Sequence, residues 1–230
     1  MFRKNSHQLI RSVLFCPTDK ISLIEKALGI GKNSSLITAD VVVLDLEDSV
    51  SPTMKEKARD NIIQVMNNIS EYSNKRRLPK TVIRINCALT TEWGIEDLKL
   101  AVKANVDAIL IPKVNNCTEL QSTLSLLQSS KTIPIWAMVE TAKGVLNSPS
   151  IADVSNIEAL VFGSNDLTKD LKSFSVNGRI PLLYSMSHCI LAARAAGKQV
   201  VDGVFMDIKD DDGFREECIA GKNLGFDGKN

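Results

Sequence analysis

Val41-Val-Val-Leu-Asp-Leu-Glu-Asp48 is a short run of apolar, mostly β-branched residues that ends in three acidic side chains. We expect a strand over Val41–Leu46, in which apolar residues follow one another almost without interruption instead of alternating with polar ones. Such a pattern is typical of a strand buried on both faces, as in a parallel sheet covered by helices. The acids Asp45, Glu47 and Asp48 then lie where this strand ends.

Six further runs of the same kind predict strands along the rest of the chain. They are Ser12–Cys16, Thr81–Asn86, Ala108–Pro112, Ile135–Glu140, Ala159–Gly163 and Val200–Phe205. Apolar residues at helical spacing predict helices between them, over Ser51–Ile69, Thr91–Lys103, Thr118–Leu127 and Pro181–Ala196. This alternation over 230 residues indicates one α/β domain spanning residues 1–230, either a doubly wound sheet or a (β/α)₈ barrel.

The polar residues that end these strands favour the (β/α)₈ TIM barrel. No Gly-x-Gly-x-x-Gly turn follows the first strand, which argues against a dinucleotide-binding sheet. Arg84, Lys113, Glu140 and Asp166 instead stand at or just after the ends of successive strands. Barrel enzymes carry their chemistry at the carboxyl ends of their strands, so we expect these side chains to meet at one rim.

Composition argues against several classes of function. Lys and Arg number 28 against 27 Asp and Glu, so the chain lacks the basic excess typical of a nucleic-acid-binding protein. No apolar run approaches the roughly 20 residues needed to span a membrane. The five cysteines are scattered without a Cys-x-x-Cys pair, which is typical of reduced thiols in a cytoplasmic protein rather than of disulfides or a zinc site.

Glu140 and Asp166 are candidate ligands for a hard divalent cation. They close neighbouring predicted strands, and Mg²⁺ prefers a few carboxylate oxygens together with water and substrate. A metal held there can polarise a carbonyl group and stabilise an enolate. The alternative is that each acid merely caps the helix that follows its strand. Two such acids with an arginine opposite favour the metal.

Arg84 is a candidate substrate-binding and catalytic residue, because it lies within an otherwise apolar strand. A buried guanidinium needs a partner, since an unpaired buried charge is costly. In the functional interpretation its planar fork grips a substrate carboxylate or keto acid. In the structural one it forms an ion pair with Glu47 or Glu140.

Glu47 and Asp48 are candidate acid–base groups, because close carboxylates oppose each other's ionisation and one can then carry a proton. They are equally suited to hold metal-bound water or to pair with Arg84 or Arg59. Lys113 raises a different possibility, a Schiff-base aldolase, although the carboxylate pair fits a metal better. The two histidines, His7 and His188, fall outside the strand ends and are expected at the surface or in packing.

Seven motifs in chain order resemble those of the HpcH/HpaI aldolase/citrate lyase superfamily, and within it the citrate lyase beta-subunit-like proteins. The resemblance runs from Arg11 to about Lys229. The motifs lie at Arg11–Pro17, Leu44–Val50, Arg84–Asn86, Pro112-Lys113, Glu140–Gly144, Phe162–Leu167 and Gly225–Lys229.

The resemblance implies a TIM barrel that assembles as a homo-oligomer, a trimer or a hexamer. It implies a Mg²⁺-dependent carbon–carbon lyase that cleaves a 3-hydroxyacyl thioester of the citryl-, malyl- or citramalyl-CoA type to a keto acid and an acetyl unit. The residues that match the family's metal ligands are Glu140 and Asp166, and Arg84 matches its substrate-binding arginine. Asp48 stands where related pyruvate aldolases carry a histidine, which favours the acyl-CoA branch.

The chain also departs from the family pattern. Family members continue past the Gly225–Lys229 turn into an eighth strand and a C-terminal helical lid, whereas this chain stops at Asn230. We therefore expect a barrel that lacks strand eight and the lid and leaves open edges on its first and seventh strands. In the loop after the first strand, Lys20 either meets a CoA phosphate or is a solvated lysine at a helix start. A non-catalytic homologue that binds Mg²⁺ and a keto acid, and an aldolase acting on a free hydroxy-keto acid, remain alternatives.

Overall fold

Eight parallel strands form one sheet whose spatial order follows the chain, from the first strand to the last. The computed structural model describes residues 10–30, 39–73, 77–127, 132–174 and 177–230. Each strand is separated from the next by helical structure, as expected for a (β/α)₈ barrel. The strands are β1 Val13–Pro17, β2 Val41–Asp45, β3 Lys80–Arg84, β4 Ala108–Ile111, β5 Ile135–Val139, β6 Ile157–Phe162, β7 Gln199–Asp202 and β8 Gly228–Lys229.

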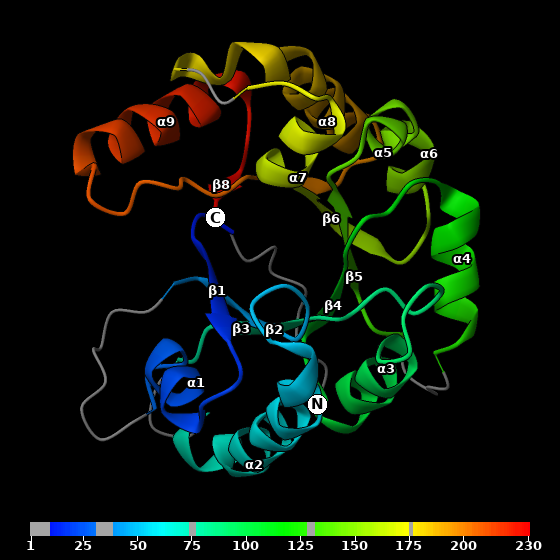
Figure 1. Cartoon of the computed structure of the whole chain (residues 1–230), viewed down its shortest axis with the longest axis vertical. Coiled ribbons are helices and arrows are strands. Elements are labelled where there is room, and N and C mark those ends of the chain that lie inside the picture. Colours follow the sequence, from blue (N-terminus) through cyan, green and yellow to red (C-terminus); the bar gives the residue numbers. More distant parts are fainter. Residues whose placement is uncertain (1–9, 31–38, 74–76, 128–131, 175–176) are drawn as a thin grey trace.

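The predicted absence of strand eight is wrong. Gly228 and Lys229 pair in parallel with Val201 and Asp202 of β7, and Lys229 also bridges to Ser12 beside β1. This two-residue strand nearly closes the ring, and the C-terminal end lies next to β1 (Figure 1). A side chain at Gly228 would collide with the backbone carbonyl of Ile10, so the close approach needs glycine. Two residues are too few to show a periodic pattern in the sequence.

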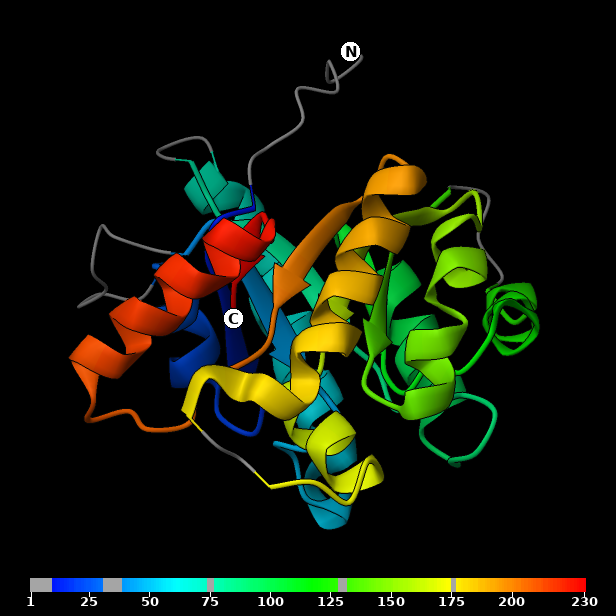
Figure 2. The same ribbon diagram turned by 90° about the horizontal axis from the view of Figure 1, so that it is seen from above.

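The helices form a ring around the strands (Figure 1). Figure 2 shows α8 lying along β7 on the outside of the sheet, in agreement with the contacts between these two elements. Among the described residues no helix is long and apolar enough to cross a membrane. The α-helices are α1 Ile21–Ala27, α2 Lys55–Ser73, α3 Gly94–Lys103, α4 Cys117–Ser125, α5 Ala142–Leu146, α6 Ser148–Ala152, α7 Ser164–Asp170, α8 Leu183–Ala195 and α9 Asp211–Leu224, with 3₁₀ turns η1 Pro52–Met54 and η2 Asn177–Leu182.

The continuous apolar runs of the strands fill two separate layers. Val41 and Val43 of β2 pack with Trp136 inside the barrel, whereas Val42 and Leu44 pack outward against the helices. Alternate residues of one strand therefore pack into different layers, and the residues of both layers are buried. This explains why the middle of each longer strand is apolar, with polar residues such as Lys80, Glu158 and Gln199 near the strand starts.

Helix ends follow local signals in the sequence. Pro52 begins the short turn η1 ahead of α2, a position where its missing N–H is not needed. Gly225 ends α9 with φ +114°, in the left-handed region that glycine tolerates best. His188 lies within α8, and its ring stacks on Tyr184 at 5.6 Å, away from the strand ends. His7 falls outside the described residues.

Candidate active site at the carboxyl rim of the barrel

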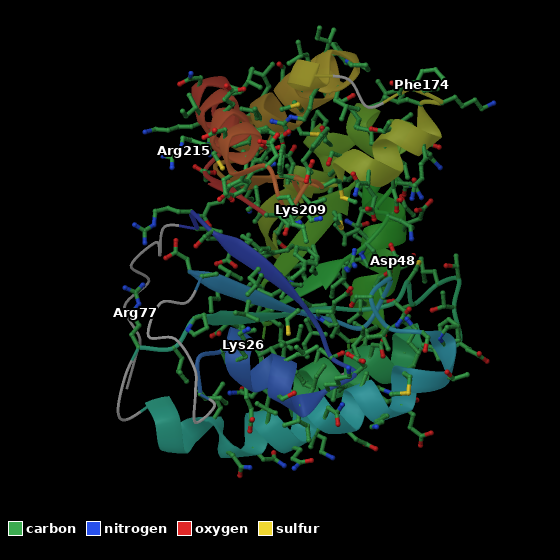
Figure 3. The ribbon with its side chains drawn as sticks, turned by 60° about the vertical axis from the view of Figure 1, so that its left-hand side comes forward. Lys26, Asp48, Arg77, Phe174, Lys209 and Arg215 are labelled. Carbon is green, nitrogen blue, oxygen red and sulfur yellow. The ribbon has the colours of Figure 1, made fainter. Side chains whose placement is uncertain are left out.

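The polar residues that follow the strands meet at one rim, as the sequence predicted. Asp45 and Arg84 are the last residues of β2 and β3, Glu140 follows β5 directly, and Asp166 lies in the first turn of α7. A cavity of about 830 Å³ opens beside Glu140 and Asp166 at this rim, and Figure 3 shows Asp48 on the loop after β2. The residues that line the cavity are Asp48, Lys113, Glu140, Thr141, Asp166, Lys169 and Asp170.

Arg84 is buried and locked by Asp45, its register partner on β2. Both Nε and Nη2 donate to the Asp45 carboxylate, each at 2.6 Å. Its guanidinium also lies 5.0 Å from the ring centroid of Phe15. Burial opposes the charge of Asp45, but the hydrogen bonds and the charge of Arg84 outweigh it and lower the pKa of this carboxyl. The edge of Arg84 that we expected to bind substrate is therefore bound to Asp45, and the third nitrogen, Nη1, donates to Met138 Sδ at 3.9 Å.

Glu47 lies beside that nitrogen. Its Oε2 is 3.1 Å from Arg84 Nη1, yet the angles do not make a hydrogen bond, and this buried oxygen is left without one. Burial, with a further contribution from the charge of Asp48, raises the pKa of Glu47 above its ordinary value. The predicted ion pair between Arg84 and Glu47 is thus present, although Asp45 is the stronger partner.

Lys113 reaches into the centre of these acids from the end of β4. Its Nζ lies 2.5 Å from Glu47 Oε1, 4.0 Å from Asp48 Oδ1 and 3.9 Å from Asp166 Oδ2. Burial lowers the pKa of this lysine, but the hydrogen bond and charge of Glu47 outweigh it and raise the pKa overall. A protonated amine is not a nucleophile, so this geometry argues against the Schiff-base alternative.

Glu140 is a buried acid of the rim whose pKa is raised. It is 3% exposed, and its Oε1 accepts the backbone N–H of Lys113 at 2.8 Å. Burial, followed by the negative charges of Glu47 and Asp166, raises its pKa from 4.5 to about 7. Gly163 lies against this side chain, and a Cβ there would come within 2.7 Å of Glu140 Oε2. The glycine thus makes room for the carboxylate.

Glu140 and Asp166 are the residues here that could hold a divalent cation. Asp166 is partly exposed and pairs with Lys169 at 2.8 Å, and both acids face the cavity. No group of three or more His, Cys, Asp or Glu in the described part of the chain forms a complete metal cage. Two carboxylates beside open space nevertheless match Mg²⁺, which keeps several water ligands. Because burial and the charges of Glu47 and Asp166 raise the pKa of Glu140, a cation bound beside it would favour its ionised form.

The buried side chain of Lys55 holds the loop that carries Glu47 in place. The Lys55 ammonium donates to the carbonyl oxygens of Leu46 and Glu47 and to Asn86 Oδ1, at 2.6, 2.7 and 3.0 Å. Asp97, which is fully buried, accepts from the backbone N–H of Asn86. The predicted Arg59 pairs with Asp97 rather than with Glu47 or Asp48.

The structure separates one predicted residue from the rest and adds others. Lys20 is exposed at the start of α1 and does not line the cavity. Lys169 and Asp170 do line it, and the sequence offered one signal for Lys169, its position three residues after Asp166 in a helix. Lys55 carried no signal of burial, because a lysine in a polar helix start is ordinarily solvated.

Known proteins are similar to this chain in sequence and in fold. A (3S)-malyl-CoA thioesterase of Cereibacter sphaeroides is 39% identical over 219 residues, which cover 95% of this chain and 71% of the relative. The citrate lyase subunit beta of Leuconostoc mesenteroides subsp. cremoris is 31% identical over 234 residues, covering 98% and 73%. A solved structure, the citrate lyase beta subunit from M. tuberculosis complexed with oxaloacetate and magnesium, is 28% identical with a TM-score of 0.76, covering 94% of this chain and 88% of that one.

The sequence pattern of one protein family matches nearly the whole barrel. The HpcH/HpaI aldolase/citrate lyase family matches residues 11–230, which include every strand from β1 to β8 and all the rim residues described above. The predicted resemblance is thereby confirmed, and this chain belongs to the HpcH/HpaI aldolase/citrate lyase family.

Proposed function

We propose that this chain is a Mg²⁺-dependent carbon–carbon lyase that cleaves a 3-hydroxyacyl-CoA thioester of the malyl, citramalyl or citryl type. The observation that carries the proposal is that Glu140 and Asp166 face one cavity on the carboxyl rim of the barrel, with Arg84 at the end of β3 on the same rim. The relatives named above act on malyl-CoA or belong to citrate lyase, which supports the thioester class.

Glu140 and Asp166 would hold the metal, since both present carboxylate oxygens to the cavity. When bound, Mg²⁺ supplies a Lewis acid that polarises a carbonyl oxygen and steadies the negative charge of an enolate. It would also restore the ordinary ionisation of Glu140, whose pKa is raised by burial and by like charges. The solved relative that contains both oxaloacetate and magnesium supports this assignment.

Arg84 would bind the carboxylate or the keto oxygen of the substrate through Nη1. Asp45 holds the other edge of the guanidinium, so Nη1, which lies 3.1 Å from Glu47 Oε2, is held in a fixed direction. The charge cannot be lost at physiological pH, because Asp45 and Glu47 raise the pKa of a group that is already strongly basic. Arg84 therefore orients the bond to be broken and stabilises the keto acid that forms.

The cleavage requires one proton to leave the 3-hydroxyl oxygen and one to reach the acetyl carbon. Asp48, which is exposed at the cavity mouth, is our candidate for accepting the first. Glu47 has a raised pKa because of its burial and can hold a proton in the interior of the site. These two acids, which both lie within 4.0 Å of Lys113 Nζ, would thus carry the two protons.

Hydrolysis of the thioester is a second candidate function. It is favoured by the thioesterase relative, which is 39% identical over 95% of this chain. The exposed Asp48 could equally activate a water molecule in the cavity. The two reactions give different products from malyl-CoA, because the lyase releases glyoxylate and acetyl-CoA whereas the thioesterase releases malate and free CoA.

Product analysis tests the proposal. Purified protein is incubated with Mg²⁺ and malyl-, citramalyl- or citryl-CoA, and the keto acid, acetyl-CoA and free thiol are each quantified. Keto acid and acetyl-CoA in equal amounts, lost in Arg84→Met, support the lyase. Free CoA without keto acid would replace the lyase with the thioesterase. Binding without turnover would indicate a non-catalytic homologue. Turnover of a free hydroxy-keto acid at a rate unaffected by CoA would indicate an aldolase.

Sedimentation velocity on the same sample tests the expected trimer or hexamer.

A further inference from the structure

Lys113 places a positive charge among the carboxylates that the proposed metal would use. Its Nζ is 2.5 Å from Glu47 Oε1 and 3.9 Å from Asp166 Oδ2. Its own backbone N–H donates to Glu140 Oε1. One residue therefore contacts both candidate metal ligands, one through its ammonium group and the other through its main chain.

The backbone of Lys113 is held in an unfavourable conformation to achieve this. Its φ is +52°, in the left-handed region that residues with a side chain seldom adopt. Such strain persists where surrounding contacts impose it, and it gathers at functional sites. Here the turn after β4 directs the N–H toward Glu140 and the side chain toward Glu47, which a residue in the extended conformation would not do together.

The ammonium group and a divalent cation cannot both keep their best contacts. Mg²⁺ binds oxygen at about 2.1 Å, so an ion on Asp166 Oδ2 would lie within about 6 Å of Lys113 Nζ as it now stands. Like charges at that distance repel strongly in a partly buried site. The lysine side chain is 43% exposed and has solvent to move into, whereas Glu47 is 9% exposed and held in place.

We propose that Lys113 is a built-in counter-ion that neutralises the rim carboxylates in the metal-free protein and gives way when a divalent cation binds Glu140 and Asp166. The inference rests on the metal-binding part of the proposed function and goes beyond it by assigning Lys113 the control of metal affinity. The metal-free site stays assembled because the lysine holds it, and the affinity for Mg²⁺ is lowered because the lysine must be displaced.

Calorimetric titration with Mg²⁺ tests the competition directly. Lys113→Met removes the charge and keeps the length of the side chain, and we expect its Kd for Mg²⁺ to fall by roughly tenfold or more relative to the wild type. Lys113→Arg keeps the charge, and its Kd should stay within about threefold of the wild type. Lys143→Met is the matched control. Lys143 is exposed, and its ammonium group lies 3.7 Å from Glu119. A Kd that is unchanged or higher in Lys113→Met would overturn the proposal.

A second measurement uses the wild-type protein and so does not depend on the folding of any variant. Lysines are acetylated briefly with an amine-reactive reagent, with and without saturating Mg²⁺, and the modification of each is quantified by mass spectrometry. Release from Glu47 should increase the labelling of Lys113 severalfold and leave Lys143 unchanged. Equal or lower labelling of Lys113 in the presence of Mg²⁺ would refute the displacement.

The outcomes separate this inference from the function on which it rests. If the wild type binds Mg²⁺ and Lys113→Met does not bind it more tightly, the counter-ion role fails and the metal site stands. If neither protein binds Mg²⁺, the proposed metal-dependent function fails first. If only Lys113→Met binds, the lysine blocks the site, which supports the counter-ion role.

Discussion

Replacing Glu140 by Gln should stabilise the metal-free protein at alkaline pH while abolishing its affinity for Mg²⁺. The side chain is 3% exposed, and its pKa is raised from 4.5 to about 7 by burial and by the charges of Glu47 and Asp166. A raised pKa means that the folded state holds the proton more tightly than the unfolded chain does. Ionisation of this group therefore destabilises the fold.

The pH dependence follows from the same values. Below pH 4.5 the carboxyl is protonated in both states and its ionisation costs nothing. Between pH 4.5 and 7 only the unfolded chain ionises, so the cost grows with pH, and above pH 7 it is complete. A rise in pKa from 4.5 to about 7 corresponds to at most about 3 kcal/mol. Gln keeps the oxygen that accepts from Lys113 and carries no charge, so it removes this cost.

Thermal unfolding in EDTA, followed by circular dichroism from pH 5 to pH 8, measures the effect. At pH 8 the variant should melt up to roughly 10 °C above the wild type, and the difference should shrink toward pH 5. Added Mg²⁺ should raise the melting temperature of the wild type and not that of the variant. Glu216→Gln, at an exposed position on α9, controls for a general effect of removing one negative charge. A variant no more stable than the wild type at pH 8, or equally stabilised at every pH, would refute the reasoning.

Three further substitutions test the surroundings of the site and the closure of the barrel. Asp45→Asn leaves the buried Arg84 charge without its bidentate partner and should cost about 3–5 kcal/mol in urea unfolding. Because the pKa of Asp45 is lowered by Arg84, this difference is present above the ordinary pKa of an aspartate and vanishes as pH falls through the folded value. Gly163→Ala adds a methyl group against Glu140 and should weaken Mg²⁺ binding about tenfold by calorimetry. Its effect on the melting temperature should be smaller than that of Asp45→Asn. Gly228→Ala pushes β8 away from Ile10, so hydrogen exchange at the Lys229 amide, which donates to Arg11, should speed up at least about tenfold.

Much of the fold could be predicted because buried parallel strands leave a strong signal. The run that was expected over Val41–Leu46 forms β2 over Val41–Asp45, and the other six predicted strands lie within a few residues of their expected positions. The position of Arg84, Glu140 and Asp166 at one rim followed from barrel topology alone, because parallel strands put their carboxyl ends on one side. What escaped was β8, whose two residues carry no periodicity.

The pairing within the site was harder to predict than its position. Asp45 was placed correctly at a strand end, yet its role as the partner of Arg84 depends on the register between β2 and β3. Alternation along β2 contained part of the answer, since Val41, Val43 and Asp45 share the inner face. The placement of Lys113 had no comparable signal, because a positive φ at a residue other than glycine is imposed by tertiary contacts.

The charges that line the cavity predict the order in which the proposed metal and substrate bind. Four of the seven lining residues are acidic, namely Asp48, Glu140, Asp166 and Asp170, against two lysines. A thioester that carries a carboxylate and a CoA phosphate is itself anionic, so this metal-free cavity repels it. A divalent cation on Glu140 and Asp166 would cancel this excess of negative charge and, in our proposal, free Lys113 from its neutralising position. The same carboxylates that oppose an anionic substrate favour a cation, so we expect Mg²⁺ to bind before the substrate approaches Arg84.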